Sequence, residues 1–209
     1  MASLTGLFLT FEGIDGAGKS TQARLLSDHL QASGHKVTLT REPGGAPGAE
    51  QIRQLLVEGD PGRWSAETEL LLFTAARRDH VERTIRPALE RGEIVLCDRF
   101  ADSTRAYQGD GPLRAIVDRL HEMMIALDPD LTLIFDIDPA AGLARTGQRT
   151  GTEDRFEQKG LGFQQRLRAA YREIAAAEPA RCLLIDADQP AEDVAKAVWA
   201  AVKPRIGTA

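Results

Sequence analysis

A glycine-rich segment near the N-terminus constrains this chain more than any other feature: residues 13–20 read Gly-Ile-Asp-Gly-Ala-Gly-Lys-Ser. They match the phosphate-binding loop pattern G-x-x-x-x-G-K-[ST]. An apolar run at 7–11 precedes the loop, and leucines at helical spacing follow it as far as Ser33 and Gly34. A strand, a glycine loop and a helix in this order direct backbone N–H groups and the positive end of a helix at an anion. The segment therefore predicts a site for nucleotide phosphates rather than a turn that merely starts a helix.

Each part of the loop has a predicted task. Its backbone N–H groups would cradle the phosphates, Lys19 would reach the terminal ones, and the Ser20 hydroxyl would hold Mg²⁺. Asp15 could equally be a capping residue of the loop. We expect contacts with the nucleotide from Gly13, Ile14, Asp15, Gly16, Ala17, Gly18, Lys19, Ser20 and Thr21.

The composition is that of an ordinary globular protein and predicts a single domain over residues 1–209. Hydrophobic residues make up 43% of the chain and charged ones 27%, which is enough to form a core. The net charge of −5 argues against a nucleic-acid-binding surface, so a polyanion site must be a local basic pocket. Cys97 and Cys182 lie in apolar runs and are expected to be reduced core residues.

We expect no membrane association and a cytoplasmic location. No apolar run approaches the ~20 residues that span a bilayer. The N-terminus is too short before the first apolar run to hold a signal peptide.

Five apolar runs alternate with helical patterns along the chain. This alternation is typical of an α/β fold in which helices cover both faces of a parallel sheet. With a phosphate loop after the first strand, it predicts a five-stranded P-loop NTPase fold. The expected strands lie at 7–11, 37–40, 94–97, 131–135 and 182–185. The expected helices include 20–31, 49–58, 66–90 with Ser65 as its N-cap, 112–127, a short helix opened by Pro139, and 191–202.

Charged residues or glycines follow each predicted strand. The carboxyl ends of parallel strands meet at one rim of the sheet, where α/β proteins bind ligands. Phosphoryl transfer between two nucleotides needs positive charge at such a rim, and the planar guanidinium suits it. A single arginine could be a solvated surface residue, but a whole set gathers in or beside these segments: Arg41, Arg77, Arg78, Arg99, Arg145, Arg149 and Arg155.

Other uses of a phosphate loop fit the sequence less well. The base-reading [NT]-K-x-D segment of GTPase switches is absent, and no second apolar strand ends in Asp-Glu as in many ATPase motors. A nucleotide-binding switch that uses ATP without an acceptor has no use for a second anion site such as Arg41, Arg77 and Arg99 would form. The sequence therefore favours a kinase.

Six segments occur in a fixed order: FEGIDGAGKST at 11–21, REPGG at 41–45, LFTAAR at 72–77, DRF at 98–100, STRAYQG at 103–109 and DADQP at 186–190. In this series, across essentially the whole chain, the protein resembles thymidylate kinases of the bacterial type. The resemblance implies direct in-line transfer of the γ-phosphoryl group from Mg²⁺-ATP to dTMP, which gives dTDP for dTTP synthesis. The alternative is another nucleotide kinase, or a deoxynucleoside kinase, of the same fold.

The same resemblance assigns roles at the phosphate of the acceptor. Arg99 would bind the dTMP phosphate, with Arg41 on its other side. Asp98, the first residue of the DRF segment, lies at the end of the predicted strand and would contact Mg²⁺ through water. Asp98 and Arg99 could also be a strand-end ion pair.

The base and sugar of dTMP receive contacts from a helix and from the STRAYQG segment. Phe73 would stack on the thymine, and Arg77, one turn later on the same helix face, would donate to a thymine carbonyl. Phe73 alone could instead be a core residue. Tyr107 would pack against the sugar and exclude a 2′-hydroxyl. Further contacts with dTMP are expected from Asp15, Glu42, Ser103, Thr104, Gln108 and Gln164.

Residues 145–162 break the helical periodicity and correspond to the small lid of this family. A lid excludes water, so that ATP is not wasted by hydrolysis. The resemblance implies that Arg149 spans the transferring phosphoryl group, with Arg145 near the adenine and Arg155 in support. Each of the three could also be a solvated loop residue.

This sequence departs from some relatives at two positions. Gly147 stands where some bacterial thymidylate kinases have a further lid arginine, which leaves open which lid arginine is catalytic. Gly16 stands where some thymidylate kinases have a catalytic arginine inside the phosphate loop. The lid must then supply that charge, so Gly16→Arg is expected to rescue Arg149→Ala.

The resemblance also implies a homodimer. Apolar residues on two predicted helices could form its interface, or they could be internal core: Leu70–Phe73, Ile116, Leu120, Met123 and Met124.

Overall fold

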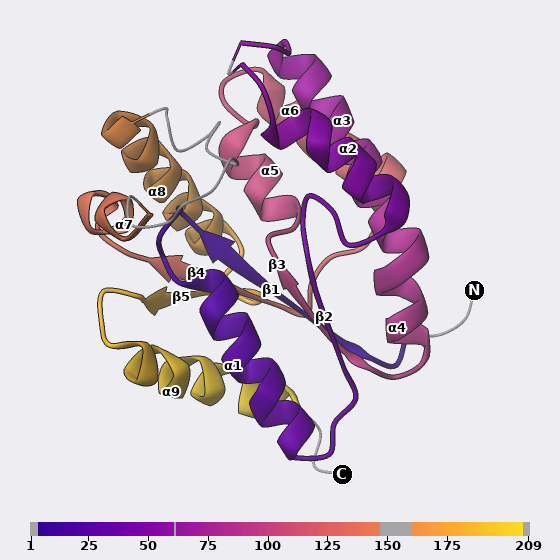
Figure 1. The fold of residues 1–209 in the computed structure, drawn as a ribbon, viewed down its shortest axis with the longest axis vertical. Coiled ribbons are helices and arrows are strands. Elements are labelled where there is room, and N and C mark those ends of the chain that lie inside the picture. The colour runs from indigo at the N-terminus through magenta and orange to yellow at the C-terminus, as the bar shows by residue number, and fades with distance from the viewer. Residues whose placement is uncertain (1–3, 61, 147–159, 207–209) are drawn as a thin grey trace.

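The computed structural model describes residues 4–60, 62–146 and 160–206. At its centre lie five parallel strands in the order β2-β3-β1-β4-β5, which confirms the predicted α/β fold (Figure 1). The strands are β1 (Leu7–Gly13), β2 (Val37–Arg41), β3 (Ile94–Asp98), β4 (Leu131–Asp136) and β5 (Cys182–Asp186). Each strand begins where its apolar run begins and continues one or two residues beyond it. The last residues of the strands are therefore five of those predicted to follow the apolar runs: Gly13, Arg41, Asp98, Asp136 and Asp186.

Helices cover both faces of the sheet, as predicted. Helices α1 (Lys19–Ala32) and α9 (Ala191–Val202) pack side by side on one face, at the bottom of Figure 1. Helices α4 (Arg86–Glu90), α5 (Ala101–Tyr107) and α8 (Gly160–Ala177) lie on the other face. Because both faces are covered, the central strands are apolar almost throughout, and several of their side chains are fully buried: Phe8, Leu9, Val95, Leu96 and Leu133.

The strand order places the end of β1 at the centre of the rim. Phe11 of β1 lies opposite Asp98 of β3 and Leu133 of β4. Arg41 of β2 is in register with Asp98. The loop at 13–20 therefore leaves the sheet between its two halves, where open α/β sheets bind their ligands.

The long helix predicted at 66–90 is present but contains a wider turn. Helix α3 (Ala66–His80) begins after Ser65, whose Oγ accepts a hydrogen bond from the Thr68 backbone N–H at 3.2 Å, as expected of an N-cap. A π-helical turn at Val81–Ile85 joins α3 to α4, just before Pro87. Proline donates no backbone hydrogen bond, and the wider turn in front of it lets the helix continue.

The other helices differ from expectation mainly at their ends. Helix α2 (Pro47–Val57) begins two residues early, because proline is favoured in the first turn. Helix α6 (Leu113–Leu120) continues into a π-helical turn at His121–Ile125, whereas α7 (Pro139–Thr146) opens at Pro139 as predicted. The sequence did not predict α5, whose seven residues are too short to show a period.

Most of the predicted lid falls on residues 147–159, which lie outside the described residues. Arg145 and Thr146 form the end of α7, and residues 160–162 form the start of α8. Cys97 and Cys182 are buried and free, which confirms them as core thiols. Across the ranges that the structure describes, no helix has the length and apolar character needed to cross a membrane.

Candidate active site

The phosphate loop, residues 13–20, needs glycine at two positions because other backbone lies against it. Gly13 and Gly16 have φ angles of 132° and 77°, which residues with side chains rarely adopt. A Cβ atom on Gly13 would lie 2.5 Å from the Phe135 carbonyl oxygen, and one on Gly16 would lie 2.1 Å from that of Gly142 in α7. A side chain at Gly16 would therefore require the backbone of α7 to shift, and the expected rescue by Gly16→Arg stays a prediction.

Lys19 is the first residue of α1 and is buried against the loop. Its Nζ donates a hydrogen bond to the Ile14 carbonyl oxygen at 2.8 Å. Burial, and next the positive charge of Arg99, lower the pKa of Lys19 to about 8. Anionic phosphates bound in the loop would favour the charged amine again, so the site is electrostatically suited to them.

Ser20 and Asp98 form a pair of oxygen donors beside Lys19. The Ser20 hydroxyl donates to Asp98 Oδ2, at the end of β3. Mg²⁺ takes one or two protein oxygens together with waters and substrate phosphates. In the described ranges, no three His, Cys, Asp or Glu side chains gather into a metal-binding group. The Ser20 hydroxyl and the Asp98 carboxylate are oxygen donors of the kind that Mg²⁺ prefers.

Arg99 lies in the turn after β3 and extends toward the phosphate loop. Its φ of 69° is unusual for a residue with a side chain. Nη2 donates to Asp15 Oδ1 at 2.6 Å, and Nη1 donates to the Gly13 carbonyl at 3.2 Å. Burial lowers the pKa of Arg99, but the negative potential of Tyr107 and Asp15 outweighs it, so the pKa lies well above its usual value. The guanidinium is thus a fixed, permanent positive charge beside the loop.

Asp15 accepts hydrogen bonds from several sides. In addition to Arg99, the Tyr107 hydroxyl and Gln164 Nε2 donate to its Oδ2, each at 3.5 Å. Burial raises the pKa of Asp15, but the positive charges of Arg99 and Lys19 outweigh it and hold the pKa below its usual range. Helix α1 has Gly18 as its N-cap with no side-chain capping bond. Asp15 is an ionised residue that lines the cavity.

Arg77 and Phe73 of α3 both line the cavity at this rim, so Phe73 is not solely a core residue. Arg77 Nε donates to Glu42 Oε2 at 2.7 Å, and its Nη2 donates to Thr104 Oγ1 at 2.9 Å. His80 Nδ1 lies 3.0 Å from the other Glu42 oxygen. These contacts fix the plane of the buried Arg77 guanidinium, whose carbon lies 5.0 Å from the centroid of the Phe100 ring.

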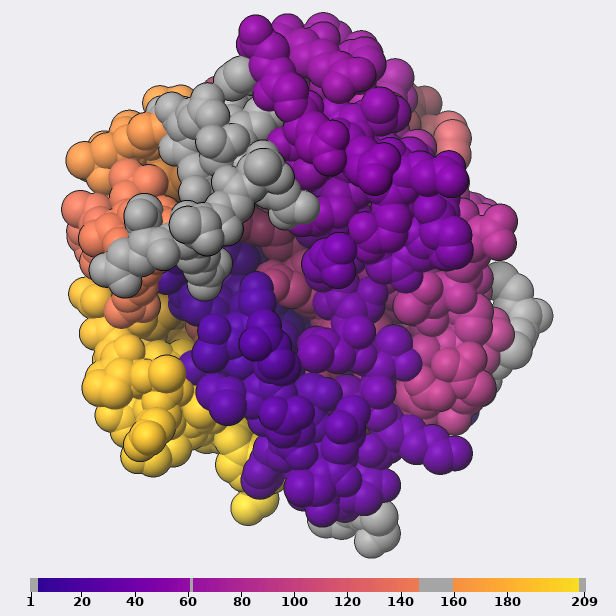
Figure 2. Space-filling view, viewed as in Figure 1, coloured from indigo at the N-terminus to yellow at the C-terminus, as the bar shows by residue number. Residues whose placement is uncertain are grey.

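One cavity at the carboxyl ends of the strands brings the phosphate loop and the acceptor residues together. It appears in Figure 2 as a hollow between the indigo N-terminal residues and the purple residues of α2. Fifteen predicted residues line it: Asp15, Gly16, Gly18, Lys19, Ser20, Arg41, Glu42, Phe73, Arg77, Asp98, Arg99, Ser103, Thr104, Tyr107 and Gln108. Gly13, Ile14 and Ala17 belong to the loop backbone behind it, and Thr21 is exposed on α1.

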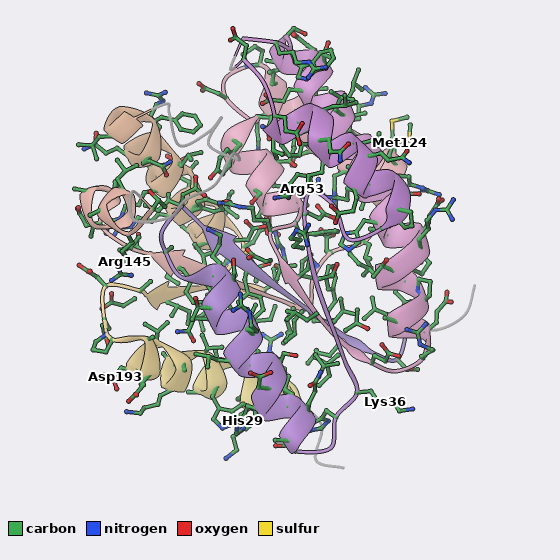
Figure 3. All side chains as sticks on the ribbon, in the orientation of Figure 1. His29, Lys36, Arg53, Met124, Arg145 and Asp193 are labelled. Carbon is green, nitrogen blue, oxygen red and sulfur yellow. The ribbon has the colours of Figure 1, made fainter. Side chains whose placement is uncertain are left out.

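Arg145, the one of the three predicted lid arginines that the structure describes, does not line this cavity. Arg145 Nη1 donates to the Ala187 carbonyl at 3.2 Å, and its Nη2 lies 3.7 Å from Asp188 Oδ1. Figure 3 shows Arg145 beside the loop between β5 and α9. Arg149 and Arg155 lie outside the described residues, so their roles remain predictions.

Arg53 is a cavity residue that sequence reasoning missed. It extends from α2 on the side that faces α5 (Figure 3), and its Nη1 donates to the Pro43 carbonyl at 2.6 Å. Val57, one helical turn further, lines the same cavity. The sequence did hold a signal for this: Arg53 and Val57 are four residues apart in the helix that follows the REPGG turn, so they lie on the same helix face.

Comparison with known proteins gives a consistent result. Residues 11–198 match the family model described as thymidylate kinase. A thymidylate kinase of Ruegeria pomeroyi is 62% identical over 91% of this chain and 92% of its own length. One of Dinoroseobacter shibae is 59% identical over 93% and 95%. The crystal structure of thymidylate kinase from Ehrlichia chaffeensis superposes with a TM-score of 0.77 at 36% identity, over 95% of this chain and 98% of that one, which confirms the P-loop NTPase fold.

Proposed function

The chain belongs to the thymidylate kinase family, and we propose that it transfers the γ-phosphoryl group of ATP to dTMP in the cavity at the rim of the sheet. The observation that carries this proposal is a second cationic site, Arg99 with Arg41, in the same cavity as the phosphate loop. Donor and acceptor phosphates that meet in one place bring several negative charges, which these groups neutralise. A protein that bound ATP alone would not need the second site.

The acceptor nucleotide would lie with its phosphate at Arg99 and Arg41 and its base over Phe73. Arg77, held in its plane by Glu42, would then donate to a thymine carbonyl. Thr104 and Gln108 line the same end of the cavity and would contact the base edge. A cation at one end and an aromatic ring with a fixed donor at the other match a pyrimidine nucleoside monophosphate.

The sugar would lie between Asp15 and Tyr107. The Tyr107 ring centroid is 5.1 Å from the Arg99 guanidinium carbon. The Phe163 ring packs edge-on against the Tyr107 ring, with 5.8 Å between the two centroids. Tyr107 is therefore packed between two neighbours and cannot move aside easily. A rigid ring against the sugar supports the exclusion of a 2′-hydroxyl, and hence a preference for deoxyribose.

The chemistry needs charge neutralisation and alignment rather than a general base. The acceptor phosphate is already anionic at pH 7, so no proton has to be removed from it, and in-line positioning supplies most of the rate. Lys19 and the loop N–H groups would hold the ATP phosphates. We propose that Arg149 completes the charge balance with Arg155 in support, and that Arg145, beside the β5–α9 loop, contacts the adenine.

We propose that Mg²⁺ accompanies the ATP. Ser20 would ligate it directly, and Asp98 would contact it through water, because their oxygens are already adjacent. Bound there, Mg²⁺ supplies positive charge to the β- and γ-phosphates during transfer. The absence of a preformed carboxylate cage in the described ranges supports a metal that enters with its nucleotide.

We further propose a homodimer that works in the cytoplasm. Apolar side chains of α3, α6 and the π-helical turn after it are exposed on neighbouring elements, and such patches mark interfaces. They are Leu71, Ile116, Met123 and Met124, the most exposed being Met123 at 63%. Leu70 is 2% exposed and belongs to the core. The free, buried cysteines suit a reducing compartment.

An acceptor panel tests the proposed activity. We expect a coupled ADP-release assay with Mg²⁺-ATP to give the highest kcat/KM with dTMP, when dTMP, dUMP, dCMP, dAMP and thymidine are compared. Thymidine should be a poor acceptor because it lacks the phosphate that Arg99 and Arg41 bind. dCMP should be rejected because its amino group meets the donor Arg77 where thymine presents a carbonyl.

Three results of this panel would contradict the proposal. A preference for thymidine would indicate a deoxynucleoside kinase, and a preference for another nucleotide would overturn the substrate assignment. ATP hydrolysis that no acceptor stimulates would favour a nucleotide-binding switch.

A further inference from the structure

A buried carboxylate, Glu12, connects three segments directly beneath the acceptor site. Its Oε1 accepts hydrogen bonds from the backbone N–H groups of Phe100 at 2.7 Å and Ser103 at 3.2 Å. Its Oε2 accepts from the Ser103 hydroxyl at 2.6 Å and from the Tyr171 hydroxyl at 3.1 Å. Glu12 belongs to β1, Ser103 to α5 and Tyr171 to α8, so one carboxylate joins these three elements.

The turn that Glu12 holds is the one that carries Arg99. The left-handed backbone of Arg99 persists only where its surroundings hold it. Its N–H donates to the Phe11 carbonyl at 2.9 Å, and the next N–H, that of Phe100, donates to Glu12. The Arg99 side chain rests on the same group, because Nη1 lies 3.1 Å from the Ser103 hydroxyl and 3.3 Å from that of Tyr171.

We propose that Glu12 is a positioning residue for phosphoryl transfer: together with Tyr171 it holds the Arg99 turn and guanidinium where the acceptor phosphate binds. This inference rests on the proposed function. Glu12 is fully buried and does not line the cavity, so it acts through Arg99 rather than on a substrate. Ser103, which does line the cavity, is the link between the two.

The charge of Glu12 matters because its four partners all donate. An ionised carboxylate accepts all four bonds, whereas a protonated one must donate at one oxygen. Burial, and next the negative charge of Asp102, raise the pKa of Glu12 to about 7, although the Ser103 hydrogen bond and Arg99 oppose the shift. The other titratable groups that act across this cluster are Lys19, Cys97, Tyr107 and Tyr171.

Two conservative variants test the proposal. In Glu12→Gln, an amide NH₂ group replaces one carboxylate oxygen and faces hydrogen-bond donors that it cannot accept from. In Tyr171→Phe, only the hydroxyl that donates to Glu12 is lost. We expect Glu12→Gln to raise the calorimetric Kd for dTMP by at least about tenfold, and Tyr171→Phe to raise it about threefold. KM for ATP should stay within about twofold, because the loop N–H groups are untouched. Ile174→Val, which trims the same helix α8 away from the cluster, should leave both values unchanged.

A pH series separates positioning from a general loss of structure. Glu12 is ionised above about pH 7 and protonated below it. The ratio of the dTMP Kd of Glu12→Gln to that of the wild-type protein should therefore fall toward one as the pH drops from 8 to 6. The titration of dTMP itself cancels in this ratio.

Distinct results would overturn the inference. A folded Glu12→Gln protein with wild-type affinity for dTMP would do so, as would equal losses of ATP and dTMP affinity or a ratio independent of pH. If Glu12→Gln does not fold, wild-type dTMP affinity in Tyr171→Phe decides against the proposal. All of these leave the proposed function standing, because that function is tested separately by dTMP binding to the wild-type protein and by the acceptor panel.

Discussion

Replacing Lys19 with methionine is expected to lower kcat by about 10²–10³-fold, the usual cost of removing one fixed positive group from a site of developing charge. Methionine keeps the length and suits the burial of this position, where Lys19 is 7% exposed, so the fold should survive. Steady-state kinetics with dTMP and ATP give the loss, and circular dichroism with urea denaturation checks the fold. Lys196→Met, at an exposed lysine that pairs with Asp193, is the matched control and should behave as wild type.

The pKa of Lys19 adds a second readout for the same variant. Its pKa of about 8 in the free protein means that the amine is charged below pH 8 and neutral above it. Bound phosphate favours the charged form, so binding takes up a proton above pH 8, and the Kd for ATP should rise by up to about tenfold per pH unit there. Lys19→Met should lose this dependence, and an unchanged pH profile in the variant would argue against direct contact of Lys19 with phosphate.

Arg99→Ala is the second substitution with a large expected effect. We expect kcat/KM for dTMP to fall by about 10³-fold or more, because an arginine that neutralises phosphate charge during phosphoryl transfer contributes on this scale. The loss has two parts, because the acceptor phosphate loses its cation and Asp15 loses its partner at 2.6 Å. The unpaired Asp15 carboxylate would then repel the incoming phosphate. Kinetics over a wide dTMP range measure both kcat and KM.

The control for Arg99→Ala is Arg83→Ala, at an arginine that is 66% exposed and pairs only weakly with Asp79 across one helical turn. Arg83→Ala should leave the kinetics unchanged. Arg99→Lys should recover only part of the loss, since a point charge cannot replace the two-pronged guanidinium. Near-normal kinetics in a folded Arg99→Ala protein would rule out the role given to Arg99.

Much of the fold follows from local sequence signals. Helix α9 occupies residues 191–202, as its periodicity predicts, and all five strands start at the first residue of their apolar runs. The strands are predicted correctly because a buried parallel strand must be apolar on both faces, which leaves a continuous apolar run in the sequence. The phosphate loop is predicted correctly for a related reason, since its function depends on glycines, Lys19 and Ser20 at a fixed spacing.

The features that sequence reasoning missed depend on contacts between distant residues. Gly16 lies against Gly142, which is far along the chain in α7, so a side chain at Gly16 would require α7 to shift. Glu12 stood inside the recognised motif, but its partners in α5 and α8 could not be read from spacing. Arg53 lines the cavity because α2 packs beside α3, and this packing lets the Arg53 side chain donate a hydrogen bond to the Pro43 carbonyl.

A crystal structure with dTMP, Mg²⁺ and a non-hydrolysable ATP analogue tests the central claim most directly. That claim is that one cavity holds both phosphates, with the acceptor between Arg99 and Phe73. We predict the dTMP phosphate within hydrogen-bonding distance of Arg99, the thymine stacked on Phe73 with Arg77 at a carbonyl, and the analogue's phosphates in the loop at 13–20. A dTMP phosphate bound away from Arg99, or a thymine outside the Phe73 side of the cavity, would contradict it.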